Sequence, residues 1–71
     1  MSIDALLPNI EAARARGAVV LLKWDGERQT DKCTVIVSHA QTDFHWRQDT
    51  DDLAGTLAEG LESFAAAWSA A

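Results

Sequence analysis

The chain has 71 residues, of which 48% are hydrophobic and 24% charged, so it is expected to form a single small domain over residues 1–71 and not a disordered segment. Eleven acids stand against six Lys and Arg residues, and the net charge of −5 argues against direct binding to nucleic acid or to an anionic membrane surface. The one cysteine cannot form an internal disulfide and the N-terminal segment does not resemble a signal peptide, which predicts a cytoplasmic protein.

Residues 3–16 are predicted to form a helix, because apolar side chains recur there at spacings of three and four. Asp4 is the expected N-cap, which places Pro8 in the first turn, where a missing N–H is tolerated. Gly17 suits the C′ position that follows a helix.

Three strands are predicted next, over residues 18–24, 32–38 and 43–48. Both connections between them are short, so the strands should form an antiparallel meander.

The apolar residues of the strands predict how the strands pair. Placing Leu22 opposite Val35 aligns the apolar residues of the first hairpin and leaves its Asp-Gly dipeptide in a bulge or a longer loop, outside a tight turn. The second hairpin is expected to pair Val37 with Phe44 and Val35 with Trp46.

The last segment, residues 49–71, predicts a second helix with one apolar stripe. Its members are Leu53, Leu57, Leu61, Phe64 and Trp68. Thr50 is the expected N-cap, followed by Asp51 and Asp52 in the first turn. Gly55 and Gly60 either weaken this helix or allow another element to approach it closely.

Together these elements predict an α+β fold in the order α-β-β-β-α, a three-stranded antiparallel meander with two helices packed on one face. The alternation of side chains predicts a continuous apolar surface on the face that the helices cover. Its members are Val20, Leu22, Trp24, Cys33, Val35, Val37, Phe44 and Trp46. The opposite face is expected to remain uncovered in a monomer.

This order of elements resembles that of the double-stranded-RNA-binding domain, which implies the same topology. That family binds RNA with a lysine-rich start of its second helix. The matching position here holds Thr50, Asp51 and Asp52, so the RNA-binding residues of the family do not carry over.

Residues 23–28 are Lys-Trp-Asp-Gly-Glu-Arg, which resembles the K-x-D-G-x-R signature of ATP-dependent DNA ligases and mRNA capping enzymes. In that family the lysine carries the nucleotide as a phosphoramide, so the resemblance would make Lys23 a nucleotide-binding residue. It covers six residues of 71, and the acidic and basic groups that complete such a site on other strands are not found in the sequence. We therefore interpret the Asp-Gly pair as residues that favour a turn, and we predict neither a catalytic residue nor a cofactor.

Cys33, His39, Asp43 and His45 are candidate metal ligands that lie close together in the sequence. They lack the tight ligand pairs of zinc sites, and the alternation of a strand directs Cys33 and His45 to opposite faces of the sheet. No metal site is predicted, and Cys33 is expected to be buried.

The uncovered sheet face is the first candidate for function. It combines an apolar patch with a polar border, and exposed apolar patches usually mark interaction sites. Its candidate interface residues are Val19, Leu21, Lys23, Ile36, His45 and Arg47. The sequence thus predicts a small acidic protein-interaction module without catalytic activity, either a homodimer or a partner-bound regulator.

The acidic C-terminal half supports an alternative function. An inhibitor, an immunity-type protein or a nucleic-acid mimic could bind a basic partner through such acids. The candidate residues of this acidic face are Asp49, Asp51, Asp52, Glu59 and Glu62. Helix capping and solubility explain the same residues, and nucleotide binding through Lys23 is a third, less favoured alternative.

Overall fold

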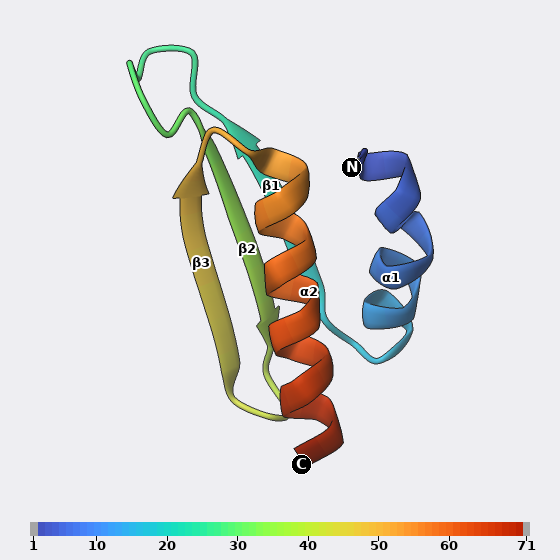
Figure 1. The fold of residues 1–71 in the computed structure, drawn as a ribbon. Coiled ribbons are helices and arrows are strands. Elements are labelled where there is room, and N and C mark those ends of the chain that lie inside the picture. Colours follow the sequence, from blue (N-terminus) through green and yellow to red (C-terminus); the bar gives the residue numbers. More distant parts are fainter. Residues whose placement is uncertain (1, 71) are drawn as a thin grey trace.

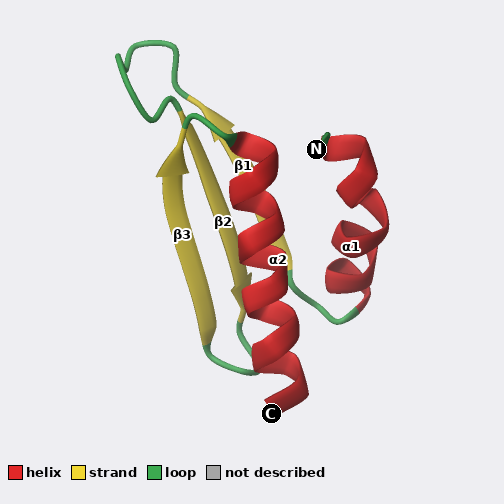
Figure 2. Cartoon of the chain, viewed as in Figure 1, coloured by secondary structure: helices red, strands yellow, loops and turns green. Residues whose placement is uncertain are grey.

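The computed structural model describes residues 2–70, and its elements follow the predicted order. They are α1 (Ile3–Ala15), β1 (Val19–Trp24), β2 (Cys33–His39), β3 (Phe44–Thr50) and α2 (Leu53–Ala70). The strands form one antiparallel sheet in the order β1-β2-β3, and both helices lie on the same side of it (Figures 1 and 2). The structure therefore confirms the predicted α+β meander.

The start of α1 differs from the prediction. The N–H of Ala5 donates to the carbonyl of Ser2 at 3.2 Å, so the helix begins at Ile3 and Asp4 lies in its first turn. Ser2 occupies the N-cap position without a capping hydrogen bond from its side chain. Consequently Pro8 lies inside the helix, where it has no N–H to donate to the carbonyl of Asp4.

The end of α1 follows the prediction for Gly17. This residue has a φ of 90°, in the left-handed region that glycine adopts without a steric penalty. Its N–H donates to the carbonyl of Arg14 at 2.9 Å, and the N–H of Ala18 donates to that of Ala13 at 3.0 Å. These two bonds form a Schellman motif, which satisfies the last carbonyls of the helix.

A buried histidine connects this helix end to the sheet and to α2. His39 is 2% exposed, and its Nε2 donates to the carbonyl of Arg16 at 2.7 Å, since a carbonyl can only accept. Its Nδ1 lies 2.8 Å from the hydroxyl of Thr42. The ring centroid is 5.2 Å from that of Phe64 and 5.5 Å from that of Trp68. One side chain thus contacts α1, α2 and the turn between β2 and β3.

The first hairpin has the predicted register. Leu22 lies opposite Val35, and Trp24 lies opposite Cys33. The N–H of Asp25 donates to the carbonyl of Lys32 at 2.6 Å, which closes a loop over residues 25–32. The Asp-Gly dipeptide therefore lies at the start of this longer loop, as the alignment of apolar residues predicts.

The second hairpin is displaced from the predicted register by two residues. Val37 lies opposite Trp46, and His39 lies opposite Phe44. The turn between the strands occupies residues 40–43 and places Asp43 at a φ of 53°. An even displacement keeps every side chain on its predicted face, so Phe44 and Trp46 still lie on the side of the helices.

The core lies between the helices and the middle of the sheet. Its buried members are Leu6, Ala13, Ala18, Val35, Val37, Leu57, Leu61 and Phe64. α2 packs on β2 and β3, whereas α1 packs on β1 and on α2. Trp24, predicted on the covered face, is 64% exposed because it is the last residue of β1, an edge strand that α2 does not contact.

The start of α2 also differs from the prediction. Thr50 is the last residue of β3, and the helix begins only at Leu53. Asp52 is the N-cap, because its Oδ1 accepts the N–H of Gly55 at 3.1 Å. Thr50 instead accepts hydrogen bonds from the N–H of Asp52 at 2.9 Å and from the hydroxyl of Thr56 at 2.8 Å.

Gly60 allows α2 to approach the sheet closely. A Cβ atom at this position would lie 2.8 Å from Cε3 and Cζ3 of Trp46 and 3.1 Å from Cγ2 of Val37. Real Cβ atoms do not make contacts as short as 2.8 Å, so the helix can lie here only because this residue has no side chain.

We predict that Gly60→Ala destabilises the protein. Overpacking against Trp46 costs about 1–3 kcal/mol, which outweighs the gain of about 1 kcal/mol that alanine gives in a helix. Urea denaturation would measure the change, with Gly26→Ala as the control, because nothing lies within 4 Å of a Cβ there. A Gly60→Ala variant more stable than the wild type would contradict this account of the packing.

Candidate functional site

The outer face of the sheet is the side opposite both helices, and alternate residues of each strand project from it (Figures 1 and 2). Val19 and Leu21 of β1 are each 53% exposed on this face. Ile36 of β2 lies beside Leu21 in the register and is half-buried. These three side chains form a contiguous apolar patch near the β1 edge.

The strand register arranges the polar side chains around this patch. Ile36 has Leu21 on one side and Arg47 on the other, and Ser38 lies between Val19 and His45 in the next row. Lys23, His45 and Arg47 are all exposed. The structure therefore brings all six predicted interface residues, Val19, Leu21, Lys23, Ile36, His45 and Arg47, onto one face.

Asp49 is the centre of a polar network at one end of the outer face. Its carboxylate accepts a hydrogen bond from Thr34 at 2.7 Å and lies 3.3 Å from Nη1 of Arg28 and 3.4 Å from Nη2 of Arg47. Arg28 also donates to the hydroxyl of Thr34 at 3.0 Å, and its Nε lies 3.2 Å from the carboxylate of Asp25. The hydrogen bond from Thr34, followed by the nearby guanidinium groups, lowers the pKa of Asp49 against an opposing effect of desolvation.

This network accounts for two of the charged residues in the ligase-like hexapeptide. Asp25 and Arg28 fasten the loop 25–32 to the sheet, and the carboxylate of Asp25 also accepts the N–H of Glu27 at 3.0 Å, as in an Asx turn. Lys23 stands apart from them, exposed on β1 beside Thr34. These contacts support the interpretation of the hexapeptide as a strand end and a loop.

Sequence reasoning missed the network because it depends on the second hairpin. The predicted register would place Arg47 opposite Thr34, whereas the observed one places Asp49 there. The signal that could have found it is the ability of a threonine hydroxyl to donate to an aspartate on the neighbouring strand, as Thr34 does to Asp49.

Asp51 and Asp52 lie in the connection between β3 and α2, where their carboxylates accept hydrogen bonds from backbone N–H groups. The carboxylate of Asp51 accepts the backbone N–H groups of Lys32 at 3.1 Å and Asp31 at 3.0 Å. Both hydrogen bonds lower the pKa of Asp51, and the one from Lys32 has the larger effect. Asp52 caps α2, so both acids stabilise the chain locally at this end of the sheet.

The five residues of the predicted acidic face do not lie on one surface. Asp49 projects from the outer face of the sheet, while Glu59 and Glu62 are exposed on α2, on the other side of it. Asp51 and Asp52 lie between these two positions, in the connection. The structure thus separates the acids that the sequence places close together.

The candidate metal ligands are separated as well. Cys33 and His39 are buried on the helix side of the sheet, whereas His45 is exposed on the outer face. Within residues 2–70, no three His, Cys, Asp or Glu side chains come close enough together to hold a metal ion.

Comparisons with known proteins add no function to this geometry. No family model, curated protein or solved structure shows a significant similarity to the chain. Neither helix in the described part of the chain combines the length and the apolar character that crossing a bilayer requires.

We predict that acid destabilises the protein partly through Asp51. Because the pKa of Asp51 is lower in the folded state than its ordinary value of 3.8, the ionised carboxylate stabilises the folded state at pH values above 3.8. This stabilisation is lost as the pH falls through the pKa of the folded state. Asp51→Asn should therefore lower the Tm at pH 7 and reduce the fall of the Tm between pH about 4 and about 2.

Thermal denaturation followed by circular dichroism over this pH range would measure both effects. Glu62→Gln is the control, because Glu62 is exposed on α2, away from the backbone N–H groups that Asp51 binds. Equal pH dependence in Asp51→Asn and the wild type would contradict the assigned role of these two hydrogen bonds.

Proposed function

We propose that this protein is a small protein-interaction module without catalytic activity of its own, and that the outer face of the sheet is its binding surface. The observation that carries the proposal is the exposure of Val19 and Leu21 beside Ile36, on a face that neither helix covers. A contiguous apolar patch with a polar border is typical of an interaction site.

The first partner that we propose is a second copy of the chain. The strands carry two cations, Lys23 and Arg47, and one anion, Asp49, so their net charge is +1 in a chain of −5. The excess negative charge therefore lies on the helices and loops. Two outer faces can approach each other without bringing most of the acids together.

The shape of the face is also suited to such a pairing. Two sheets that pack face to face lie about 10 Å apart and bury the side chains between them. In a two-fold arrangement, Val19, Leu21 and Ile36 of each copy would lie against the other copy, with Lys23 and Arg47 at the hydrated border. Because three strands of six or seven residues offer a small area, we expect a weak dimer that depends on concentration.

A different protein that presents an apolar strip could bind the same face, in which case the chain would be a partner-bound regulator. An inhibitor or a nucleic-acid mimic that acts through the acidic face has less support, because the acids are separated and three of them bind local groups. We propose a cytoplasmic location, since the buried Cys33 is a free thiol.

We predict that Leu21→Glu weakens the dimer. At protein concentrations of tens of micromolar the wild type should sediment as a dimer in equilibrium with the monomer. A charge in the middle of the apolar patch should raise the dissociation constant roughly tenfold or more, because it would be buried without a partner. Analytical ultracentrifugation across a concentration series measures this constant.

Leu7→Glu is the matched control for this experiment. Leu7 is 49% exposed, close to the 53% of Leu21, but it projects from α1 on the other side of the sheet. The Leu7→Glu variant should dimerise like the wild type. A wild type that remains monomeric, or a dimer that Leu7→Glu disrupts and Leu21→Glu does not, would contradict the proposal for self-association.

A further inference from the structure

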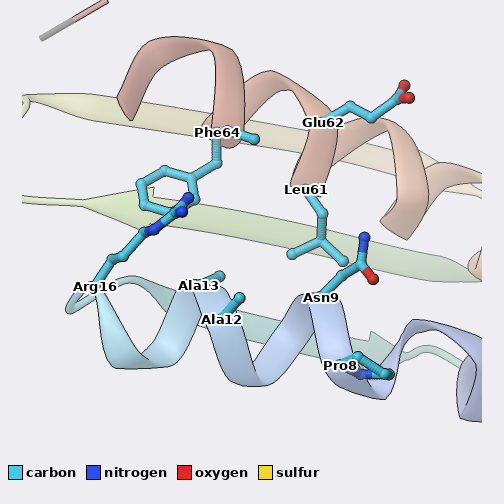
Figure 3. Close-up of a pocket in the computed structure, with 9 residues that line it drawn as sticks. Pro8, Asn9, Ala12, Ala13, Arg16, Leu61, Glu62 and Phe64 are labelled. Carbon is cyan, nitrogen blue, oxygen red and sulfur yellow. The ribbon is translucent and has the colours of Figure 1, made fainter. Parts of the chain in front are cut away.

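A groove lies between α1 and α2, and it is separate from the outer face of the sheet (Figure 3). It is open to solvent and has a volume of about 340 Å³, at the lower end of the range for small-molecule sites. Leu61 and Phe64 of α2 lie beneath it and are 5% and 1% exposed, so its accessible apolar lining comes from Pro8, Ala12 and Ala65.

Small side chains keep the two helices from filling this space. Ala12 and Ala13 of α1 and Ala65 of α2 line the groove and reach no further than a methyl group. A longer apolar residue at Ala12 or Ala65, both exposed, would occupy the gap. The sequence of both helices therefore leaves room for an apolar ligand.

A cation stands at one end of the groove. The side chain of Arg16 extends from the end of α1 toward α2 (Figure 3), and its Cζ lies 5.3 Å from the centroid of the Trp68 ring. Within residues 2–70, its guanidinium group makes no hydrogen bond or ion pair, whereas that of Arg14 lies 2.8 Å from Glu11. A cation over an aromatic ring is attracted by the ring quadrupole and keeps its full charge.

The main chain of Arg16 is also fixed in place. The residue precedes Gly17 in the Schellman motif, and its carbonyl accepts the hydrogen bond from His39. These bonds fix the position from which the exposed side chain of Arg16 extends at one end of the groove.

The other side of the groove carries an anion. Glu62 lies on α2 away from Arg16, and its carboxylate points away from α1 (Figure 3). A negatively charged group would be attracted to Arg16 and repelled at the side of Glu62. An anionic group is therefore favoured at the end of the groove with Arg16.

We propose that this groove binds a small amphipathic monocarboxylate. Its apolar body would lie between the helices against Pro8, Ala12 and Ala65, and its carboxylate would accept hydrogen bonds from the Arg16 guanidinium group. This inference is independent of the proposed dimer, because the groove and the outer face lie on opposite sides of the sheet.

Sodium decanoate is a suitable probe, titrated into the ¹⁵N-labelled protein and followed by amide chemical shifts. We expect saturable shifts at Asn9, Ala12 and Ala65, which line the groove, and none at Val19 or Leu21 on the outer face. Decanol has the same chain without the charge and should bind roughly tenfold more weakly or worse.

Two variants test the contacts separately. Arg16→Gln should weaken decanoate binding roughly tenfold or more, whereas Arg14→Gln, on the same helix but paired with Glu11, should leave it unchanged. Ala12→Leu should block the groove without removing the cation. The dispersion of the amide spectrum shows whether each variant is folded.

The proposal would be overturned by an absence of saturable shifts in the groove at millimolar decanoate, by equal binding of decanol, or by equal losses in Arg16→Gln and Arg14→Gln. Shifts confined to Val19 and Leu21 would also overturn it, because they would show that decanoate binds the apolar patch of the outer face instead.

Discussion

The buried imidazole of His39 is the interaction on which the arrangement of this small protein depends. Both of its ring nitrogens have partners, one at the end of α1 and one in the turn between β2 and β3, and its ring packs against the aromatic side chains of α2. A polar ring that is 2% exposed is stable only with both nitrogens satisfied, so its hydrogen bonds fix the end of α1 over the end of β2. With α2 packed against the same ring, both helices are held on one face of the sheet.

Because both helices pack on the same face of the sheet, the opposite face is left without a covering element. The chain has two helices and a sheet with two faces, so the outer face keeps its apolar patch of Val19, Leu21 and Ile36 exposed or half-exposed. The same anchor at the end of α1 positions Arg16 beside the groove between the helices. Asp49, Asp51 and Asp52 meanwhile bind the loop 25–32 and the start of α2, so much of the acidity in the C-terminal half stabilises the fold.

The sequence predicted which face of the sheet each strand residue lies on better than it predicted how the strands pair. The physical reason is that side chains along a strand alternate between the two faces. Whether a residue faces the helices depends only on its parity along the strand, so all six outer-face residues could be placed without the exact register. The first register could be predicted because both strands are rich in apolar residues and one alignment pairs them. β3 has only Phe44 and Trp46 to align, and the turn with Asp43 at positive φ decided the register instead. The exposure of Trp24 and the groove depend on where the helices end and on how they pack, which no local pattern encodes.

Methyl-resolved NMR over a concentration series would test most directly whether the outer face is the binding surface, because methyl groups report on one face of a strand at a time. From tens of micromolar to millimolar protein, the account predicts progressive shifts of the Val19, Leu21 and Ile36 methyl groups, with those of Val35 and Val37 on the buried face nearly unchanged. Concentration-dependent shifts confined to the helices, or no shifts on the outer face over this range, would contradict it.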